Sequence, residues 1–167
     1  MNMILVSECL FGGRIVRYDG RACEETDSRF LIWKDEGRLV PICPEVFGGL
    51  SVPRMDAQRS GDKVIDRAGH DVTAKYEKGA YEAVRLAKES GAVFAVMKQN
   101  SPSCGSRCVY DGSFSGKKIC GQGLTAEYLR KAGFIVFGED ELDAACALLD
   151  DIEKCDIRRC REGKSND

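Results

Sequence analysis

The sequence predicts an α/β fold: a single domain with a mostly parallel, Rossmann-like sheet that is flanked by helices on both faces. Apolar segments rich in valine and isoleucine recur along the chain, and helical segments separate them. The apolar segments are as hydrophobic as strands that are covered on both sides of a parallel sheet. With 167 residues, of which 43% are hydrophobic, the chain is long enough for one ordinary core.

The first part of the chain predicts two strands joined by a short helix. MILVS, residues 3–7, is an apolar run of strand length, and LVPIC, residues 39–43, is a second. Between them, SRFLIWKDEG (28–37) predicts the short helix. These elements begin the alternation of strands and helices.

The central part predicts the longest helix and a third strand. From about Thr73 to Ser90 the apolar residues share one helical face, Asp71 or Thr73 can cap the start, and Gly91 ends the helix. AVFAVM, residues 92–97, follows as a strand of apolar residues.

The last part predicts a fourth strand between two helices. TAEYLRKAG (125–133) predicts a helix that ends at its glycine, and FIVF (134–137) predicts the strand. A final helix is expected from about residue 139 to 155, because acidic residues at its start suit a helix N-terminus. We therefore assign residues 1–155 to the domain and residues 156–167 to a polar C-terminal tail.

Two long irregular segments interrupt this pattern. They span about residues 44–62, after the second strand, and 98–123, after the third. Irregular segments of this length in a compact domain usually carry function or are mobile. In the second, VYDGSFSGKKI (109–119) places an Asp-Gly turn between two short strand-like pieces, which predicts a hairpin.

Charge and hydropathy favour a small-molecule partner in the cytoplasm. The 25 basic and 27 acidic residues give a formal charge of -2, so no overall field attracts nucleic acid. No segment approaches the roughly 20 apolar residues that span a bilayer. The start, MNMILVSECL, lacks the basic region of a signal peptide. The single histidine, His70, is expected to be a surface turn residue.

The chain has nine cysteines, and an odd number cannot all pair within one molecule. In a reducing compartment, cysteines more often bind metal or react than form disulfides. Five of the nine are expected to have structural or incidental roles, because they lie in helical or polar segments or have no local partner pattern. These five are Cys23, Cys120, Cys146, Cys155 and Cys160.

Three other cysteines follow predicted strands. Cys9 comes two residues after the first strand, Cys43 ends the second, and Cys104 comes seven residues after the third. The carboxyl ends of parallel strands share the edge at which open α/β folds bind ligands, so we expect these thiols to converge. A zinc ion with an open position, an iron-sulfur cluster with one iron free of protein ligands, and three unrelated cysteines are the possible interpretations.

Four motifs in combination resemble a known family. They are SECL with RYDG soon after, CPEVFGGLSVPR, KQNSPSCG, and YDGSFSGKKICGQGLTAEYLRKAGFIVF. Together they resemble the family that includes the bacterial thiouracil desulfidases, long catalogued as a domain of unknown function, over residues 3–137. The resemblance implies a [4Fe-4S] cluster held by Cys9, Cys43 and Cys104. It also implies that the fourth iron takes the sulfur of a thiolated uracil, in a desulfuration without net redox change.

The resemblance also implies two active residues, Glu45 of CPEV and Ser101 of SPSCG. In such a reaction Glu45 would activate the attacking water or carry its proton, and Ser101 would orient the base or relay a proton. A capping or turn role is the alternative for each of them. The expected substrate is a thiolated pyrimidine, as the free base or a nucleoside.

Four further residues are candidates for binding the substrate: Arg17, Asp19, Arg54 and Ser103. Arg17 or Arg54 would hold a pyrimidine carbonyl, and an ion pair with Asp19 or Asp56 is the alternative for either guanidinium.

Other readings of the same residues stay open. Cys104 could be a nucleophile that carries a persulfide in sulfur transfer, because proline and glycine beside it could expose its thiol. The chain could instead be a metal-binding, cluster-binding or tRNA-binding module without turnover. Many relatives have a further cysteine where this chain has Val16, which argues against an extra ligand from that loop, and Cys108 matches no ligand of the family.

Overall fold

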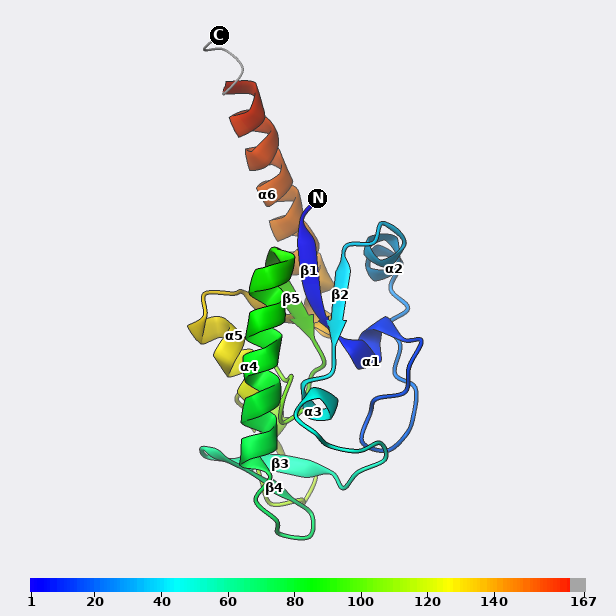
Figure 1. Cartoon of the computed structure of the whole chain (residues 1–167), viewed down its shortest axis with the longest axis vertical. Helices are drawn as coiled ribbons and strands as arrows, with labels where there is room; N and C mark the ends of the chain where they lie inside the picture. The colour runs from blue at the N-terminus through cyan, green and yellow to red at the C-terminus, as the bar shows by residue number, and fades with distance from the viewer. Residues whose placement is uncertain (163–167) are drawn as a thin grey trace.

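The computed structural model describes residues 1–162, which form an α/β fold around one parallel sheet (Figure 1). The strand order is β2-β1-β5-β8, and every neighbouring pair is parallel, as the sequence predicts. The last strand begins at Val136, two residues later than predicted. The four strands are β1 (Met3–Ser7), β2 (Leu39–Ile42), β5 (Ala92–Met97) and β8 (Val136–Gly138).

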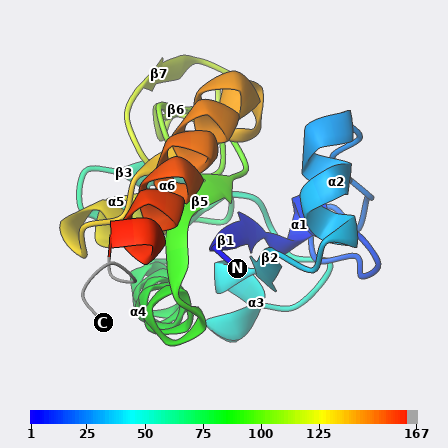
Figure 2. The ribbon, with the colours of Figure 1, turned by 90° about the horizontal axis from the view of Figure 1, so that it is seen from above.

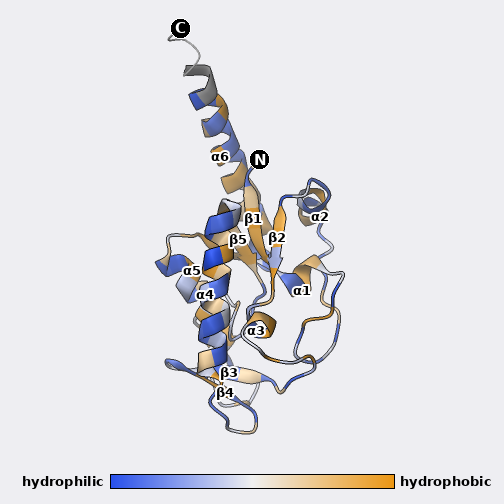
Figure 3. Ribbon diagram, in the orientation of Figure 1, coloured by the Kyte–Doolittle hydropathy of each residue, from blue (hydrophilic) through white to orange (hydrophobic). Residues whose placement is uncertain are grey.

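Different helices cover the two faces of the sheet. Alternate residues of a strand point to opposite faces. In β1, Ile4 and Val6 pack with α2 and α6, whereas Leu5 packs with α4 and α5. Figure 2 shows α4 on one side of the sheet and α2 and α6 on the other, and Figure 3 shows the apolar strands between them. The helices are α2 (Ser28–Asp35), α4 (Thr73–Ser90), α5 (Leu124–Lys131) and α6 (Leu142–Glu162).

Helix α4 has the bounds that the sequence predicts, although its first turn is not capped as expected. The N-cap residue is Val72, without a side-chain cap, so the cap expected from Asp71 or Thr73 is not formed. The Oδ1 atom of Asp71 accepts the backbone N–H of Thr73 at 3.0 Å, in the turn that leads into the helix. Gly91 ends the helix in the left-handed conformation, with φ of 70°. None of the helices in residues 1–162 combines the length and apolarity that crossing a bilayer requires.

Helix α6 is longer than predicted, because residues 156–162 contain no glycine or proline to stop it. Part of the predicted tail is therefore helical, and this end of α6 projects beyond the sheet (Figure 1). The remainder of that tail, residues 163–167, and the side chain of Cys160 lie outside the described part of the chain.

The segment predicted as irregular between residues 44 and 62 contains two short elements. Helix α3 (Pro44–Phe47) starts directly after Cys43, with proline at its first position, where the missing N–H costs nothing. Strand β3 (Ala57–Ser60) pairs antiparallel with β4 (Lys63–Asp66). Four residues are too few for either element to show a clear hydrophobic period.

The predicted hairpin after β5 is present. Strand β6 (Cys108–Tyr110) pairs antiparallel with β7 (Lys118–Cys120), and the turn spans residues 111–117. Two further short helices complete the fold: α1 (Glu8–Phe11), directly after β1, and the 3-10 helix η1 (Glu139–Glu141), before α6.

Close contact between backbones fixes α3 against α4. A Cβ atom at Gly79 would lie 1.8 Å from the carbonyl oxygen of Pro44, and one at Gly48 would lie 2.0 Å from that of Lys75. Only glycine permits backbones to approach this closely. The contact therefore sets the position of the first turn of α3 relative to the sheet.

We predict that Gly79→Ala lowers the free energy of unfolding by about 2 kcal/mol, because the new methyl group must push α3 away from α4. Denaturant unfolding measures this change. Lys78→Ala, at an exposed position of the same helix, is the control and should change stability by less than about 0.5 kcal/mol. Equal stability of the two variants would contradict the proposed contact.

Candidate functional site

A cavity of about 420 Å³ opens at the carboxyl ends of β1, β2 and β5. Its wall also includes the loop after α1, the segment around α3 and β3, and the hairpin of β6 and β7. This is the edge at which α/β folds bind ligands, and the volume is in the usual range for small-molecule sites.

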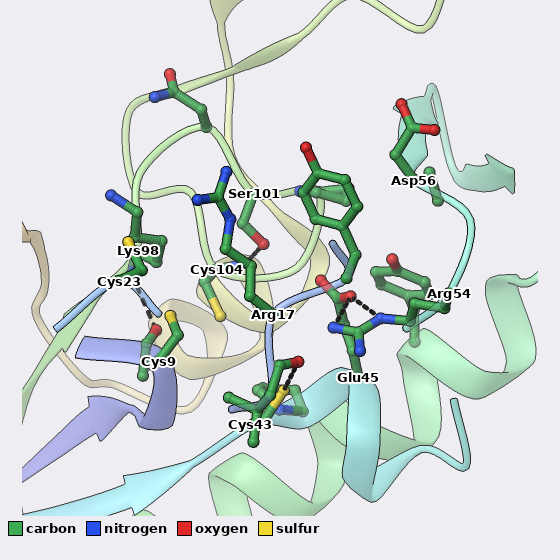
Figure 4. A pocket seen from close by; sticks show the side chains of 18 of the residues that line it. Cys9, Arg17, Cys23, Cys43, Glu45, Arg54, Asp56, Lys98, Ser101 and Cys104 are labelled. Atoms are coloured by element: carbon green, nitrogen blue, oxygen red, sulfur yellow. Dashed lines mark hydrogen bonds and ion pairs between the residues drawn. The ribbon is translucent and has the colours of Figure 1, made fainter. Parts of the chain in front are cut away.

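The three cysteines that follow strands all line this cavity. Cys9 lies in α1 directly after β1, Cys43 precedes α3 directly after β2, and Cys104 lies in the loop after β5. Figure 4 shows their sulfur atoms pointing toward a common space. The parallel sheet therefore brings together three thiols that are far apart in the sequence.

These thiols are buried and close enough to affect one another. Burial raises the pKa of Cys104 to about 12, with further contributions from Cys43 and Glu45, although neighbouring serine hydroxyls lower it. Burial also raises the pKa of Cys9, and the negative charge of Cys104, Cys23 or Cys43 would raise it further. Burial thus favours the protonated thiols, whereas a bound metal favours the thiolates, because a coordinated thiol loses its proton.

A single metal ion and a cluster of several atoms require different spacings of their ligands. Ligands of one tetrahedral zinc ion lie about 4 Å from one another. Within residues 1–162, no three histidine, cysteine or acidic side chains are grouped for one metal ion. Soft thiolates from distant parts of the chain suit an iron-sulfur cluster, so the donor set fits the [4Fe-4S] group that the sequence implies.

Glu45 lies in the first turn of α3, two residues after Cys43, and lines the same cavity. Arg54 donates from Nε at 2.8 Å and from Nη2 at 2.7 Å to the Oε2 atom of Glu45. Only 12% of the Glu45 side chain and 7% of the Arg54 side chain are exposed, so solvent screens this ion pair little. Tyr76 is also close: burial, and then the charge of Glu45, raise the pKa of its hydroxyl.

Ser101 lines the cavity and shapes the loop that carries Cys104. Its Oγ atom accepts the backbone N–H of Ser103 at 3.1 Å and that of Cys104 at 3.0 Å. The turn role anticipated as an alternative is therefore present. These two bonds use the oxygen as an acceptor, so the hydroxyl proton remains available to donate to a ligand.

The predicted substrate-binding residues fall into two groups. Arg17 and Arg54 line the cavity, and Arg54 pairs with Glu45 instead of Asp56. Asp19 does not line it, and its Oδ1 atom lies 3.6 Å from Nε of Arg17. Ser103 also lies outside the cavity. Its side chain is fully buried and its hydroxyl bonds that of Thr125 at 2.8 Å, so it joins the loop to α5.

Several cavity residues were not predicted as part of a site, and the charged Lys98 and the thiol of Cys23 are two of them. Lys98 follows β5 and pairs with Glu139, and its positive charge lowers the pKa of Cys9. Cys23, which we expected to have a structural or incidental role, lines the cavity close to Lys98 and Cys9. A position directly after a strand could have identified Lys98. No local signal marks Cys23, because its loop reaches the cavity without regular structure.

His70 lies in a surface turn, as expected, and its side chain is mostly exposed. Its Nδ1 atom lies 2.9 Å from a carboxylate oxygen of Asp66, within the turn after β4. His70 does not line the cavity that contains the three cysteines.

Each of three comparisons with known proteins finds a match. The model of the 2-thiouracil desulfurase family matches residues 4–141. The chain is 44% identical over 151 residues to the uncharacterized protein YbbK of Bacillus subtilis (strain 168). This alignment covers 84% of this chain and 98% of YbbK. Among solved structures, it is similar to the [4Fe-4S]-dependent thiouracil desulfidase TudS, with a TM-score of 0.87 and 41% identity over 90% of this chain and 99% of that one.

The chemistry of Cys104 gives a test of the nucleophile hypothesis. In the metal-free protein at pH 8, we predict that iodoacetamide modifies the exposed Cys120 and Cys155 well before Cys104, because a buried thiol with a pKa of about 12 supplies little thiolate. Mass spectrometry of tryptic peptides over time gives the three rates. Modification of Cys104 as fast as Cys120 would support a reactive nucleophile instead.

Proposed function

Because this chain belongs to the 2-thiouracil desulfurase family, we propose that it is a [4Fe-4S]-dependent desulfidase that removes the sulfur of thiolated uracil, as the free base or a nucleoside. The proposed reaction is hydrolysis: the C=S group and water give C=O and hydrogen sulfide, without net oxidation or reduction. The observation that carries the proposal is the convergence of Cys9, Cys43 and Cys104 in a cavity that also contains Glu45.

Cys9, Cys43 and Cys104 are proposed as the protein ligands. With three thiolate ligands, the cluster supplies one iron that is free to act as a Lewis acid toward the thione sulfur. Cys9 and Cys43 directly follow β1 and β2, and Cys104 lies in the loop after β5, where Ser101 holds its backbone N–H.

We propose Glu45 as the group that activates water. Its carboxylate lies in the cavity wall, and the contacts from Arg54 hold one of its oxygen atoms in a fixed position. A positioned carboxylate that takes a proton from water as the water attacks carbon contributes about 10²–10⁴-fold to a rate. Arg54 is a positioning residue in this proposal, because it acts through Glu45.

Ser101 and Arg17 are proposed to orient the pyrimidine. The hydroxyl of Ser101 can donate its proton to an acceptor atom of the base, while its oxygen stays fixed by two backbone N–H groups. Arg17 lines the cavity beside Tyr18 and can donate to a pyrimidine carbonyl. Asp19 contributes by holding Arg17, and the buried Ser103 is not part of the proposed binding set.

The proposed enzyme is a hydrolase that acts on small molecules in the cytoplasm. The cysteines in the described residues are all free, which is typical of a reducing compartment. The formal charge of -2 gives no overall attraction for a polyanion. The buried Cys104 thiol argues against the persulfide-transfer alternative, because a nucleophile needs an accessible thiolate.

We predict that Cys9→Ala, Cys43→Ala and Cys104→Ala each abolish cluster binding and hydrogen sulfide release from 2-thiouracil. Anaerobic reconstitution followed by iron and sulfide analysis and absorption spectroscopy measures the first effect. Cys146→Ala, a partly buried cysteine outside the cavity, should retain both properties. Loss of activity in Cys104→Ala alone would point back to a single nucleophile.

We predict that Glu45→Gln lowers kcat by about 10²–10⁴-fold with unchanged iron content, because the amide keeps the size of the side chain but cannot take a proton. Steady-state kinetics on reconstituted protein gives this value. Asp56→Asn is a matched control: Asp56 also lines the cavity, but it pairs with Arg67 and should change kcat by less than tenfold. Similar losses in both variants would argue for a general electrostatic effect.

A further inference from the structure

Two cysteines outside the proposed ligand set face each other across the hairpin of β6 and β7. Cys108 is the first residue of β6 and Cys120 is the last residue of β7, and the antiparallel register pairs them directly. Both are free thiols in this structure. The fold thus aligns two thiols that are twelve positions apart in the sequence.

The pattern of backbone hydrogen bonds shows that this is a closely spaced pair. Gly121 N–H donates to the carbonyl of Arg107, and Asp111 N–H donates to that of Lys117, both at 3.0 Å. Hydrogen-bonded and non-hydrogen-bonded pairs alternate along an antiparallel ladder. Cys108 and Cys120, which come next to Arg107 and Gly121, therefore form a non-hydrogen-bonded pair. The Cα atoms of such a pair lie roughly 4.5 Å apart. That spacing is within the range that a disulfide spans, about 4.4–6.8 Å.

The two side chains also lie on the same face of the hairpin. Two positions along, Tyr110 and Lys118 form the next pair of the same kind, and Nζ of Lys118 lies 5.6 Å from the centre of the Tyr110 ring. Residues two apart in a strand share a face. Cys108 and Cys120 therefore share the face of Tyr110 and Lys118, whereas Val109 between them is buried on the other face.

Both thiols can be reached from solvent. The side chain of Cys120 is exposed and that of Cys108 is half-buried. By contrast, Cys104, four residues before Cys108, is buried in the cavity wall. An oxidant of moderate size can therefore reach the hairpin without entering the cavity.

We propose that Cys108 and Cys120 are a reversible thiol-oxidation site that forms a cross-strand disulfide. The oxidant is a low-molecular-weight disulfide. The Cys120 thiolate attacks one of its sulfur atoms, which breaks that S–S bond, forms a mixed disulfide and releases one thiol. The Cys108 thiolate then attacks the sulfur of Cys120, which forms the protein disulfide and releases the second thiol. Two cysteine thiols are oxidised and one small disulfide is reduced to two thiols, so atoms and electrons balance.

The disulfide would brace a wall of the cavity. Tyr110 and Phe114 of this hairpin line the cavity, and the Oε1 atom of the buried Gln58 accepts the backbone N–H of Phe114 at 3.1 Å. At the base of the hairpin, Asn100 N–H donates to the carbonyl of Cys108 at 3.1 Å. A covalent link between β6 and β7 adds a third restraint to these two contacts.

The test uses the full chain with its cluster reconstituted anaerobically. The protein is incubated with mixtures of reduced and oxidised glutathione, free thiols are trapped with N-ethylmaleimide, and tryptic peptides are analysed by mass spectrometry. Trypsin separates Cys108 from Cys120 by cutting after Lys117 and Lys118. We expect residues 108–117 and 119–130 to appear as one linked pair that dithiothreitol separates.

Two variants complete the test. In Cys120→Ser the linked peptides should disappear, and Cys155→Ser, which removes an exposed thiol of α6, should still form them. Hydrogen exchange of residues 110–119 should slow on oxidation of the wild-type protein and not on oxidation of Cys120→Ser. Stable glutathione adducts on Cys120 with Cys108 unmodified, or a disulfide of Cys108 with another cysteine, would overturn the proposal.

Discussion

The parallel pairing of β1 with β2 and β5 is the constraint on which the site depends. Ser7 pairs with Ile42, so the chain leaves β1 and β2 at the same level, and Cys9 and Cys43 follow within two residues. The exit from β5 is fixed as well, because Ser7 Oγ accepts the N–H of Lys98 at 2.9 Å. Three chain segments thus start from one edge of the sheet, and the thiols they carry lie in one cavity.

At this edge of the sheet, Glu45 and Arg54 form a buried ion pair, and burial of charged groups is unfavourable in free energy. Removing both ions from water costs several kcal/mol per ion before their attraction and hydrogen bonds offset it. An apolar pair would fill the same space without that cost. The physical advantage of the pair is that it holds a charged carboxylate in a fixed orientation beside the buried thiols.

Hydrophobic patterning was sufficient to predict the sheet and the long helix. The strands are buried on both faces, and α4 has an apolar face and a stop signal at Gly91. The same reasoning placed Cys9, Cys43 and Cys104 together, because a position after a strand carries spatial information.

The remaining parts depend on tertiary contacts that leave no local pattern. Helix α3 and strand β3 have four residues each, and α3 is held by the approach of Gly79 to Pro44. Cys23 reaches the cavity through a loop, so spacing could not reveal it. Ser103 and Ser101 are two residues apart in one loop, yet the first turns toward Thr125 and the second toward the cavity. Sequence separation alone cannot distinguish these directions.

Gln58 joins two hairpins of the cavity wall that lie far apart in the sequence. Its side-chain oxygen joins β3 to the turn of the other hairpin, at Gly112 and Phe114, so the two hairpins form one unit. That unit contributes Gln58, Tyr110 and Phe114 to the cavity wall. It contains none of Cys9, Cys43 and Cys104. A substitution at Gln58 would therefore alter the shape of this wall through both hairpins at once, although none of the three sulfur donors belongs to either hairpin.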